Sequence, residues 1–504
     1  MQVSPPRRDA QCWLLGIAVL SACSWARWLA TGSPKVDENY PSEPVGCLLL
    51  AGVIVGWALM VLGWRGLLLR PVANPRRLAF TGLGLATAML PLLSNDIFSL
   101  MAYGSLAAGG HDVYTSAAAL PQSVWYSWIG QNWNDKVCVY GPTTLLAILP
   151  ARLAGESPWA AIALFRLLWL PPLLLVMELS FRRLRDRPFF HAMVWLNPLW
   201  VLEGPGQLHA DLLGVMAVVA GVILQQRGRP LAGWTAWALA TLGKYSFAFT
   251  GAWFWLSGAR STRERLLRIP ALAGVVALVG VAFFAPFWRS VATILEPIHT
   301  LAGMNPGGSI AEVAGHIVHV LRGGAIPSPE TPVRVAIEMD RATKGSTWFA
   351  VSLVMRVVSL AVGLRILQWI LRRPRDEGRI AMGTGAIVVA VITLASHRFQ
   401  AWYLLAALPF FGLHCPPVWR RWWIAIAAVS VAPDFTHVLP KTAMILPLWS
   451  AVSTGACVVL FLFDFRGRYL RLEDGASTAQ DVPLSPATLA PCAASRAIAT
   501  GSRT

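Results

Sequence analysis

Charged residues are scarce in this chain of 504 residues: Asp, Glu, Lys and Arg together account for 13% of it, whereas hydrophobic residues account for 56%. This balance excludes an ordinary soluble domain and is typical of an integral membrane protein. Apolar runs of roughly 17 to 25 residues recur along almost the whole length, and each is long enough to cross a bilayer as a helix. They are too long and too uniformly apolar for barrel strands. We therefore expect an all-α, polytopic membrane protein of about 12–14 transmembrane or re-entrant helices.

Clustered cysteines are also missing. The seven cysteines are scattered, mostly within apolar runs, and none follows another at CxxC or a similar ligand spacing. Neither a disulfide framework nor a metal site is therefore predicted. We find no tandem repeats of roughly 20–50 residues. No cleavable signal peptide is evident, so the first apolar segment, about residues 12–30, is interpreted as a retained span.

Acidic residues are outnumbered by basic ones, 25 to 42, and the formal net charge is +17. In a soluble protein this excess would suggest a nucleic-acid partner. Here the arginines cluster in short loops between apolar runs, which is the positive-inside pattern of membrane proteins, so no nucleic-acid partner is expected. The clusters that we place on the inner side lie at residues 7–8, 65–77, 182–187, 227–229, 260–268, 372–379, 420–421 and 466–471.

This placement predicts one transmembrane domain at residues 1–471, with large outer loops at 95–157 and 289–345. The tail at 472–504 is rich in Ala, Ser, Thr and Pro, so we expect it to be disordered and cytoplasmic. The spans fall near residues 11–31, 46–64, 77–94, 158–180, 190–206, 209–226, 268–288, 346–371, 379–396, 400–415, 421–437 and 443–464.

Two stretches do not fit as full spans. Residues 142–155 are too short to cross, so we expect a re-entrant or interfacial helix there. Residues 231–257 lie between two basic loops and are predicted to form a hairpin of two short helices, with Lys244 near its tip.

Asp96 is the most informative residue. It follows an uncharged apolar run, residues 78–93, and stands at the head of the first outer loop. A carboxylate at the edge of a membrane is costly to bury, so an ionisable residue at such a position more often has a functional role. A carboxylate can also take the proton from an attacking hydroxyl, which makes Asp96 a candidate general base.

The predicted topology brings most other unusual polar residues to the same outer side. Arg, Lys and His can hold a phosphate leaving group and neutralise its developing charge. Aromatic rings offer flat faces to sugars. The chemistry indicated is transfer of a group from a phosphate-linked lipid donor onto a hydroxyl. The candidates for the donor phosphate are His209, Lys244, His397 and Arg398, and those for sugar or acceptor hydroxyls are Asp112, Tyr140 and Asp211.

Each candidate also has a simpler interpretation. Asp96 could cap a helix, and His209 and Asp211 could cap one or pair with each other. Lys244 could extend its charged end to the interface. His397 and Arg398 could be ordinary loop residues, and the tryptophans of the first outer loop could be interfacial anchors.

Several ordered strings resemble those of membrane glycosyltransferases of the GT-C class, most closely the polyprenol-phosphate-mannose-dependent α-1,6-mannosyltransferases. They cover roughly residues 75–415 and are SNDIFSLMAYG at 94–104, GHDVY at 110–114, YGP at 140–142, LNPL at 196–199, HAD at 209–211, KY at 244–245 and FQAWY at 399–403. The resemblance implies a GT-C-type fold and an inverting transfer from a polyprenyl-phosphate sugar. It also implies that an acceptor-activating aspartate lies in the first outer loop, where this chain has Asp96.

We therefore expect a hexosyltransferase of the cytoplasmic membrane that moves a sugar, most simply mannose, to a glycan or glycolipid acceptor on the outer, periplasmic side. The resemblance implies no cofactor and no metal; the partners are the lipid-linked donor, the acceptor and membrane lipids. A transporter or flippase for lipid-linked sugars is the first alternative, but it predicts repeated halves and polar residues along a path at mid-membrane. A non-catalytic partner in envelope polysaccharide assembly and a ligase or polymerase using diphosphate-linked glycans are the others.

Overall fold

The computed structural model describes residues 5–33, 43–70, 72, 74–129, 133–303, 318, 321, 333–395, 401–430, 456–458, 460–462 and 464, with only the backbone for 5–6, 43, 302–303, 333–349, 395, 401 and 418. Every regular element in these ranges is a helix. The chain divides into a unit of residues 1–462 and a unit of residues 463–504, of which only Asp464 is described. The predicted tail at 472–504 and the candidates His397 and Arg398 lie outside the described residues.

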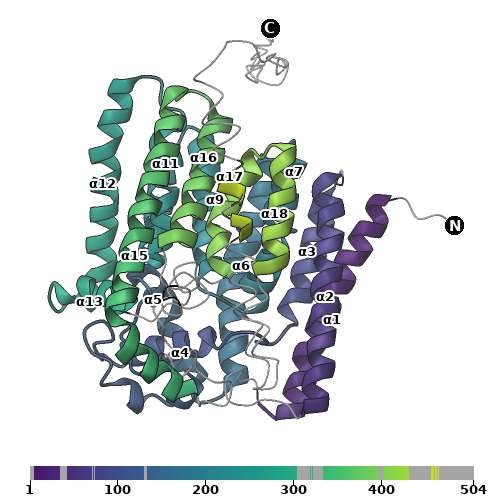
Figure 1. Ribbon diagram of the computed structural model, residues 1–504, viewed down its shortest axis with the longest axis vertical. Helices are drawn as coiled ribbons and strands as arrows, with labels where there is room; N and C mark the ends of the chain where they lie inside the picture. The colour runs from purple at the N-terminus through teal and green to yellow at the C-terminus, as the bar shows by residue number, and fades with distance from the viewer. Residues whose placement is uncertain are drawn as a thin grey trace, which may run out of the picture. The chain divides into compact units, whose positions relative to one another are not determined.

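Six helices are long and apolar enough to cross a membrane, or up to seven if one bent pair is counted as a single span. This confirms the all-α, polytopic fold. Figure 1 shows these helices as the long ribbons of the first unit. They are α1 (Pro5–Thr31), α2 (Glu43–Leu69), α6 (Pro158–Arg183), α12 (Thr262–Phe284) with the turn after it to Phe287, the part of α15 (Val333–Arg372) from Ala350 on, and α16 (Glu377–Ala390) with the turn after it to Leu394.

Helices α1 and α2 pack unusually closely because glycines line their crossing. A Cβ added at Gly16 would lie 2.5 Å from the Met60 nitrogen, and one added at Gly63 would lie 2.4 Å from the Trp13 nitrogen. Small residues at such positions let the two backbones approach each other, which is the usual way that membrane helices associate.

The other spans are built from shorter or broken helices. Helices α5 (Pro142–Ile148) and η3 (Leu149–Ala154) form the short segment expected at 142–155. As predicted, two short helical segments flank Lys244: α10 (Pro230–Gly243) precedes it, and η5 (Tyr245–Thr250) with α11 (Gly251–Leu256) follows it. The remaining short helices are η1 (Leu120–Gln122), η2 (Tyr126–Trp128), η6 (Ala285–Phe287), α13 (Ala292–Gly303), η7 (Val391–Ala395), η8 (Ala401–Ala407), α17 (Leu408–Leu413) and α18 (Pro417–Ser430).

Two expected spans differ from the prediction. Residues 190–206 form two short helices, Pro188–Val194 and Pro198–Val201, and the wide turn Leu202–Gly206 in place of one span. Residues 77–94 were expected to be helical throughout, but α3 (Pro75–Thr87) ends seven residues earlier, since 94 − 87 is 7. Pro91 explains the break, because a proline disfavours helical geometry in the residue before it and cannot donate a backbone hydrogen bond. The segment 88–95 is therefore irregular although most of it is buried.

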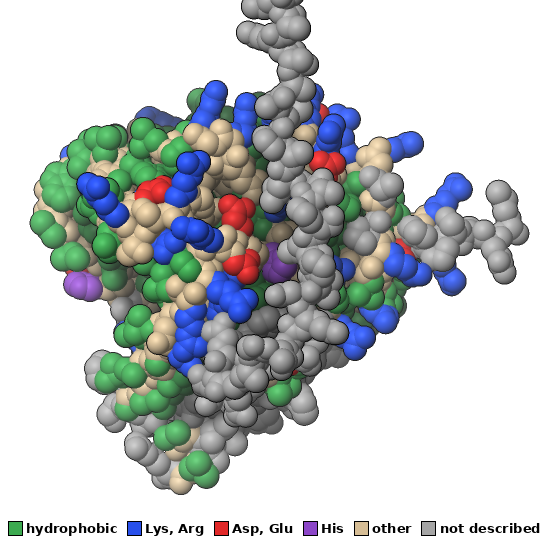
Figure 2. Space-filling model, turned by 90° about the horizontal axis from the view of Figure 1, so that it is seen from above, with side chains coloured by type: hydrophobic (Ala, Val, Ile, Leu, Met, Phe, Trp, Pro, Cys, Tyr) green, Lys and Arg blue, Asp and Glu red, His purple; other side chains and the backbone are tan. Residues whose placement is uncertain are grey.

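The loops that carry the arginine clusters lie together. The Arg375 guanidinium donates a hydrogen bond to the Arg260 carbonyl oxygen at 3.1 Å, which joins two of the predicted inner loops. The Arg420 guanidinium lies over the Phe189 ring at 4.2 Å, beside a third. Figure 2 shows many Lys and Arg side chains on one end of the molecule, whereas α4 and α5 lie toward the other end in Figure 1.

Candidate active site

Asp96 is the first residue of helix α4 (Asp96–Ala108), where the sequence had predicted the head of an outer loop. Its backbone N–H donates to the Ser94 hydroxyl at 3.1 Å. Unpaired N–H groups at a helix N-terminus carry partial positive charge, so this position favours a carboxylate. The side chain is 20% exposed, which leaves it accessible from one side only.

The irregular segment before Asp96 is held by side chains from distant helices. Gln207 Oε1 accepts hydrogen bonds from the backbone N–H groups of both Leu92 and Leu93, each at 2.9 Å. The Leu90 N–H donates to the Ser24 hydroxyl at 3.0 Å. Buried N–H groups without partners would each cost about 1–3 kcal/mol, so these acceptors let a non-helical segment lie in an apolar interior.

Gln207 belongs to a sharp bend that contributes most of the site. Here α7 (Pro188–Val194), α8 (Pro198–Val201) and the wide turn η4 (Leu202–Gly206) precede α9 (Asp211–Gln226). The segments Pro198–Gly206 and Asp211–Gln226 meet at 119°. Leu208, between them, has a φ of 59°, a left-handed conformation that costs a non-glycine residue on the order of 1–3 kcal/mol and is concentrated at functional sites.

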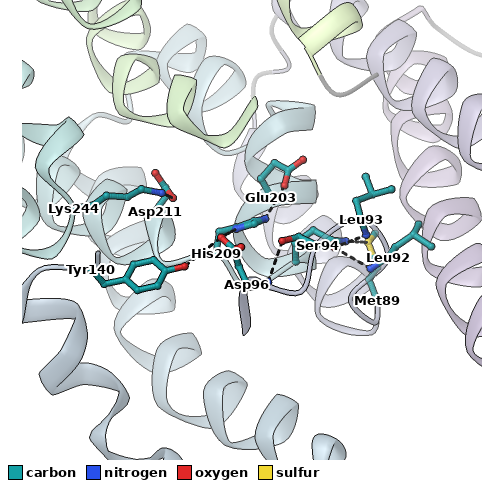
Figure 3. A network of polar contacts seen from close by, with 11 residues as sticks. Met89, Leu92, Leu93, Ser94, Asp96, Tyr140, Glu203, His209, Asp211 and Lys244 are labelled. Carbon is teal, nitrogen blue, oxygen red and sulfur yellow. Dashed lines mark hydrogen bonds and ion pairs between the residues drawn. The ribbon is translucent and has the colours of Figure 1, made fainter. Parts of the chain in front are cut away.

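His209 lies in this bend between two carboxylates (Figure 3). Its Nδ1 is 3.1 Å from Asp96 Oδ2, and its Nε2 is 3.2 Å from Glu203 Oε2. The ring stacks on Trp402 with the ring centres 3.9 Å apart. The side chains of His209 and Glu203 are fully buried, so Asp96 is the member of this trio that a substrate can reach.

A second pair lies beside the trio in Figure 3. The Lys244 ammonium, at the C-terminal end of α10, forms an ion pair with Asp211, the first residue of α9. Its Nζ also lies 4.5 Å from the centre of the Tyr403 ring. Asp211 is 1% exposed and Lys244 is 16% exposed. A partly exposed ammonium on a buried carboxylate is well placed to meet an anion from the open side.

Tyr140, which comes from the predicted first outer loop, contacts Asp96 directly. Its hydroxyl donates to Asp96 Oδ2 at 3.4 Å, and burial, with the Asp96 charge, raises the phenol's pKa well above its usual range. It therefore remains a hydrogen-bond donor. The next residue, Gly141, donates its N–H to the Gly243 carbonyl at 2.9 Å, and a Cβ at Gly141 would lie 1.9 Å from the Leu242 oxygen. Only glycine permits this approach.

Five of the eight residues predicted from the sequence therefore converge: Asp96, His209, Lys244, Tyr140 and Asp211. Asp112 is not labelled in Figure 3, and the hydrogen bonds of its side chain are local. Its carboxylate accepts from the Tyr114 and Thr115 N–H groups at 3.0 and 3.1 Å and from the Thr115 hydroxyl, which is a turn arrangement. Its role in binding a sugar stays a prediction.

Glu203 and Gln207 are the residues whose roles the sequence did not reveal. Glu203 was visible as an acid among the outer polar residues, and the LEGPG string around it combines Gly and Pro in a way that breaks a helix. The contact with His209 was not predictable, because it depends on the tight fold of the η4 turn. That turn is closed by backbone bonds from Gln207 to Leu202 and from Leu208 to Gly204, both 2.8 Å.

No group of three or more His, Cys, Asp or Glu side chains in the described part of the chain is arranged to hold a metal ion. The described site does hold ionisable groups that can take part in acid–base and ionic steps. A carboxylate that is open on one side can accept a proton, and a neighbouring ammonium can neutralise an anion.

The fold and the site define a polytopic membrane protein with a mixed acid–base centre set into one end of its helices. Residues 14–260 match the family described as alpha-(1->6)-mannopyranosyltransferase, N-terminal domain. The chain is thus a homologue of these mannosyltransferases, which are hexosyltransferases.

Two relatives carry the name Alpha-(1->6)-mannopyranosyltransferase A. The one from Mycobacterium tuberculosis is 27% identical over 420 residues, covering 77% of each chain. The one from Corynebacterium glutamicum is 24% identical over 373 residues, covering 69% of this chain and 72% of its own. No solved structure matches this chain at a significant level. These matches confirm the family resemblance inferred from the ordered strings.

Proposed function

We propose that this protein transfers mannose from a polyprenyl-phosphate donor to a hydroxyl of a glycan or glycolipid acceptor, with inversion at the anomeric carbon. The names of the two relatives support mannose as the sugar. The observation that carries the mechanism is the position of Asp96: it is the one member of the buried trio that is open to a substrate, and the Lys244 ammonium lies in the same cluster.

In the proposed reaction, Asp96 removes the proton from the acceptor hydroxyl while the hydroxyl oxygen attacks the anomeric carbon. The bond between that carbon and the phosphate oxygen breaks, and polyprenyl phosphate leaves. Lys244 neutralises the charge that develops on the phosphate, together with His397 and Arg398 as the sequence predicts. His209 has no exposed surface to offer the donor, so we assign it to Asp96 instead of the phosphate.

We also propose that the site opens to the outer, periplasmic side. The basic loops gather on one end of the molecule, and α4 and α5 lie toward the other. The positive-inside rule assigns the basic end to the cytoplasm. Labelling of single cysteines by an impermeant reagent in intact cells tests this. A cysteine introduced at Asp135 is expected to react, and one introduced at Arg229 is not.

The test of the activity is a donor screen with purified protein in lipid nanodiscs. Polyprenyl-phosphate mannose, glucose and galactose are supplied with a panel of alkyl glycosides, and the products are identified by mass spectrometry. The Asp96→Asn protein is expected to lose about 10²–10⁴-fold in rate, the usual contribution of a general base. Asp135→Asn is the matched control, because Asp135 is a 62% exposed carboxylate of the same loop that pairs with Lys136. Normal transfer by a folded Asp96→Asn protein refutes the assignment.

A further inference from the structure

We infer that Glu203 is a positioning residue, which holds His209 in its doubly protonated form so that His209 fixes the orientation of the Asp96 carboxylate. This inference rests on the proposed function, since it specifies how the proposed base is controlled. The residue touches no substrate, because its side chain is fully buried.

The argument begins with the two contacts of one ring. An ionised carboxylate only accepts hydrogen bonds, so a ring nitrogen that faces one must carry a proton. His209 faces Asp96 with Nδ1 and Glu203 with Nε2. Nε2 and Oε2 lie at ion-pair distance without a hydrogen bond between them, so the second contact is electrostatic. A nearby opposite charge favours the charged form of a titratable group, so the second carboxylate stabilises the imidazolium.

The charges around the trio point the same way. The groups that face it are Asp96 from α4, Glu203 from η4 and the Asp211–Lys244 pair from α9 and α10. The Tyr140 hydroxyl and the Trp402 ring complete the surroundings. Lys244 is engaged by Asp211. Without a proton on both nitrogens, His209 would leave two neighbouring carboxylates with no cation between them, which is strongly unfavourable in a buried site.

Glu203 depends on His209 in return. Among the described residues, neither oxygen of the Glu203 carboxylate accepts a hydrogen bond, and the 3.2 Å contact of Oε2 with His209 Nε2 is the one ion pair that Glu203 makes there. A carboxylate that served only to stabilise the η4 turn would instead be expected to bond backbone N–H groups. The backbone N–H groups of Gln207, Leu208 and His209 bond to backbone carbonyls of this turn, which leaves the carboxylate to the imidazole.

The geometry has a consequence for catalysis. The contact to Asp96 Oδ2 sets the direction of the carboxylate plane, and misplacement of a catalytic group by about 1 Å can cost on the order of 100-fold in rate. Loss of the Glu203 charge removes the partner that stabilises the imidazolium. His209 then loses its second proton at lower pH, and Asp96 loses its orienting contact.

The experiment compares Glu203→Gln with wild-type protein in nanodiscs, using the donor and alkyl glycoside that give transfer. Glutamine keeps the size of the side chain and removes its charge. We expect kcat to fall about 10-fold or more, with the KM of the donor within about twofold of wild type, and the alkaline limb of the pH–rate profile to move down by about one pH unit or more. Glu203→Asp is expected to recover part of kcat and to restore the position of the limb. A purely structural role would not move that limb.

If Glu203→Gln does not fold, the double variant Glu203→Gln/His209→Gln takes its place, since it removes both buried charges together. It is expected to fold, to transfer slowly and to have no alkaline limb from this group. A wild-type kcat and pH profile in either folded variant overturns the inference while Asp96→Asn remains inactive. Absence of transfer by the wild-type protein, or normal transfer by Asp96→Asn, refutes the proposed function itself and with it this inference.

Discussion

Variants of the Lys244–Asp211 ion pair should affect thermal stability and transfer activity in different ways. Lys244→Met keeps the length of the side chain and removes its charge. Asp211 is then left 1% exposed with no cation in contact, and its Oδ1 already has no hydrogen-bond partner among the described residues. Breaking a buried pair on one side costs about 3–5 kcal/mol, so we expect a large loss of thermal stability.

Replacing both partners should remove most of that loss. In Lys244→Met/Asp211→Asn no buried charge is left unpaired, and such exchanges are often close to neutral. We therefore expect the double variant to unfold within a few degrees of wild type in a fluorescence-detected thermal assay. Its transfer activity should stay low and its donor KM high, because the proposed phosphate cation is still missing.

Two results would refute this reasoning. A Lys244→Met protein as stable as wild type would mean that Asp211 is not held as a buried anion. A double variant with normal donor KM and kcat would mean that Lys244 balances Asp211 and has no role toward the phosphate. The Lys136→Met variant controls for general effects of losing a lysine, since the partner of Lys136, Asp135, is 62% exposed.

Three further outcomes are expected. Gly141→Ala should destabilise the protein by more than about 2 kcal/mol and reduce transfer, because the new methyl group would overlap the Leu242 carbonyl oxygen at 1.9 Å. The control variant Gly84→Ala, which has open space around the new methyl group, should be neutral in the same thermal assay. Gln207→Leu should lower the unfolding temperature, because two buried N–H groups lose their acceptor at about 1–3 kcal/mol each; an unchanged temperature would contradict the role given to that amide. Partial burial acts to raise the pKa of Asp112, whereas the hydrogen bonds from the Thr115 hydroxyl and two backbone N–H groups act to lower it. The hydrogen bonds prevail, so the pKa of Asp112 lies below its ordinary value. The ionised Asp112 side chain therefore contributes fully to the free energy of unfolding above about pH 4, the ordinary pKa of an Asp carboxyl group. This contribution is lost as the pH falls through the pKa of Asp112 in the folded protein, so Asp112→Ala should flatten the acid side of a curve of stability against pH.

The long spans were predictable because a membrane helix satisfies its own backbone and needs only apolar side chains to be recognised. The predicted spans 11–31, 46–64 and 158–180 lie inside helical spans of the structure, whose ends extend up to five residues beyond them, and the predicted span 379–396 begins two residues after Glu377, the first residue of another. The site residues Asp96, His209 and Lys244 were also visible, since isolated charges in an apolar chain are conspicuous.

The end of α3 was not predictable at the same level. Hydropathy detects that residues 89–93 are apolar and buried, but it does not detect whether their backbone is helical. The irregular form exists because Ser24 and Gln207 supply acceptors from far away in the chain, 66 and 115 positions from the N–H groups of Leu90 and Leu92. Such partners become known only when the fold is known. The role of Glu203 was not predictable for the same reason, because its contact with His209 depends on the fold of the η4 turn.

The irregular segment 88–95 also determines where changes of chain length can be tolerated. An added residue extends a helix by about 1.5 Å, but it extends a stretched chain by about 3.3 Å. One insertion between α3 and Asp96 would therefore displace the carboxylate by about the full length of its 3.1 Å contact with His209. Insertions and deletions among homologous chains should accordingly be rare at these eight positions. They should be more frequent in loops whose backbone N–H groups are not hydrogen-bonded to distant side chains.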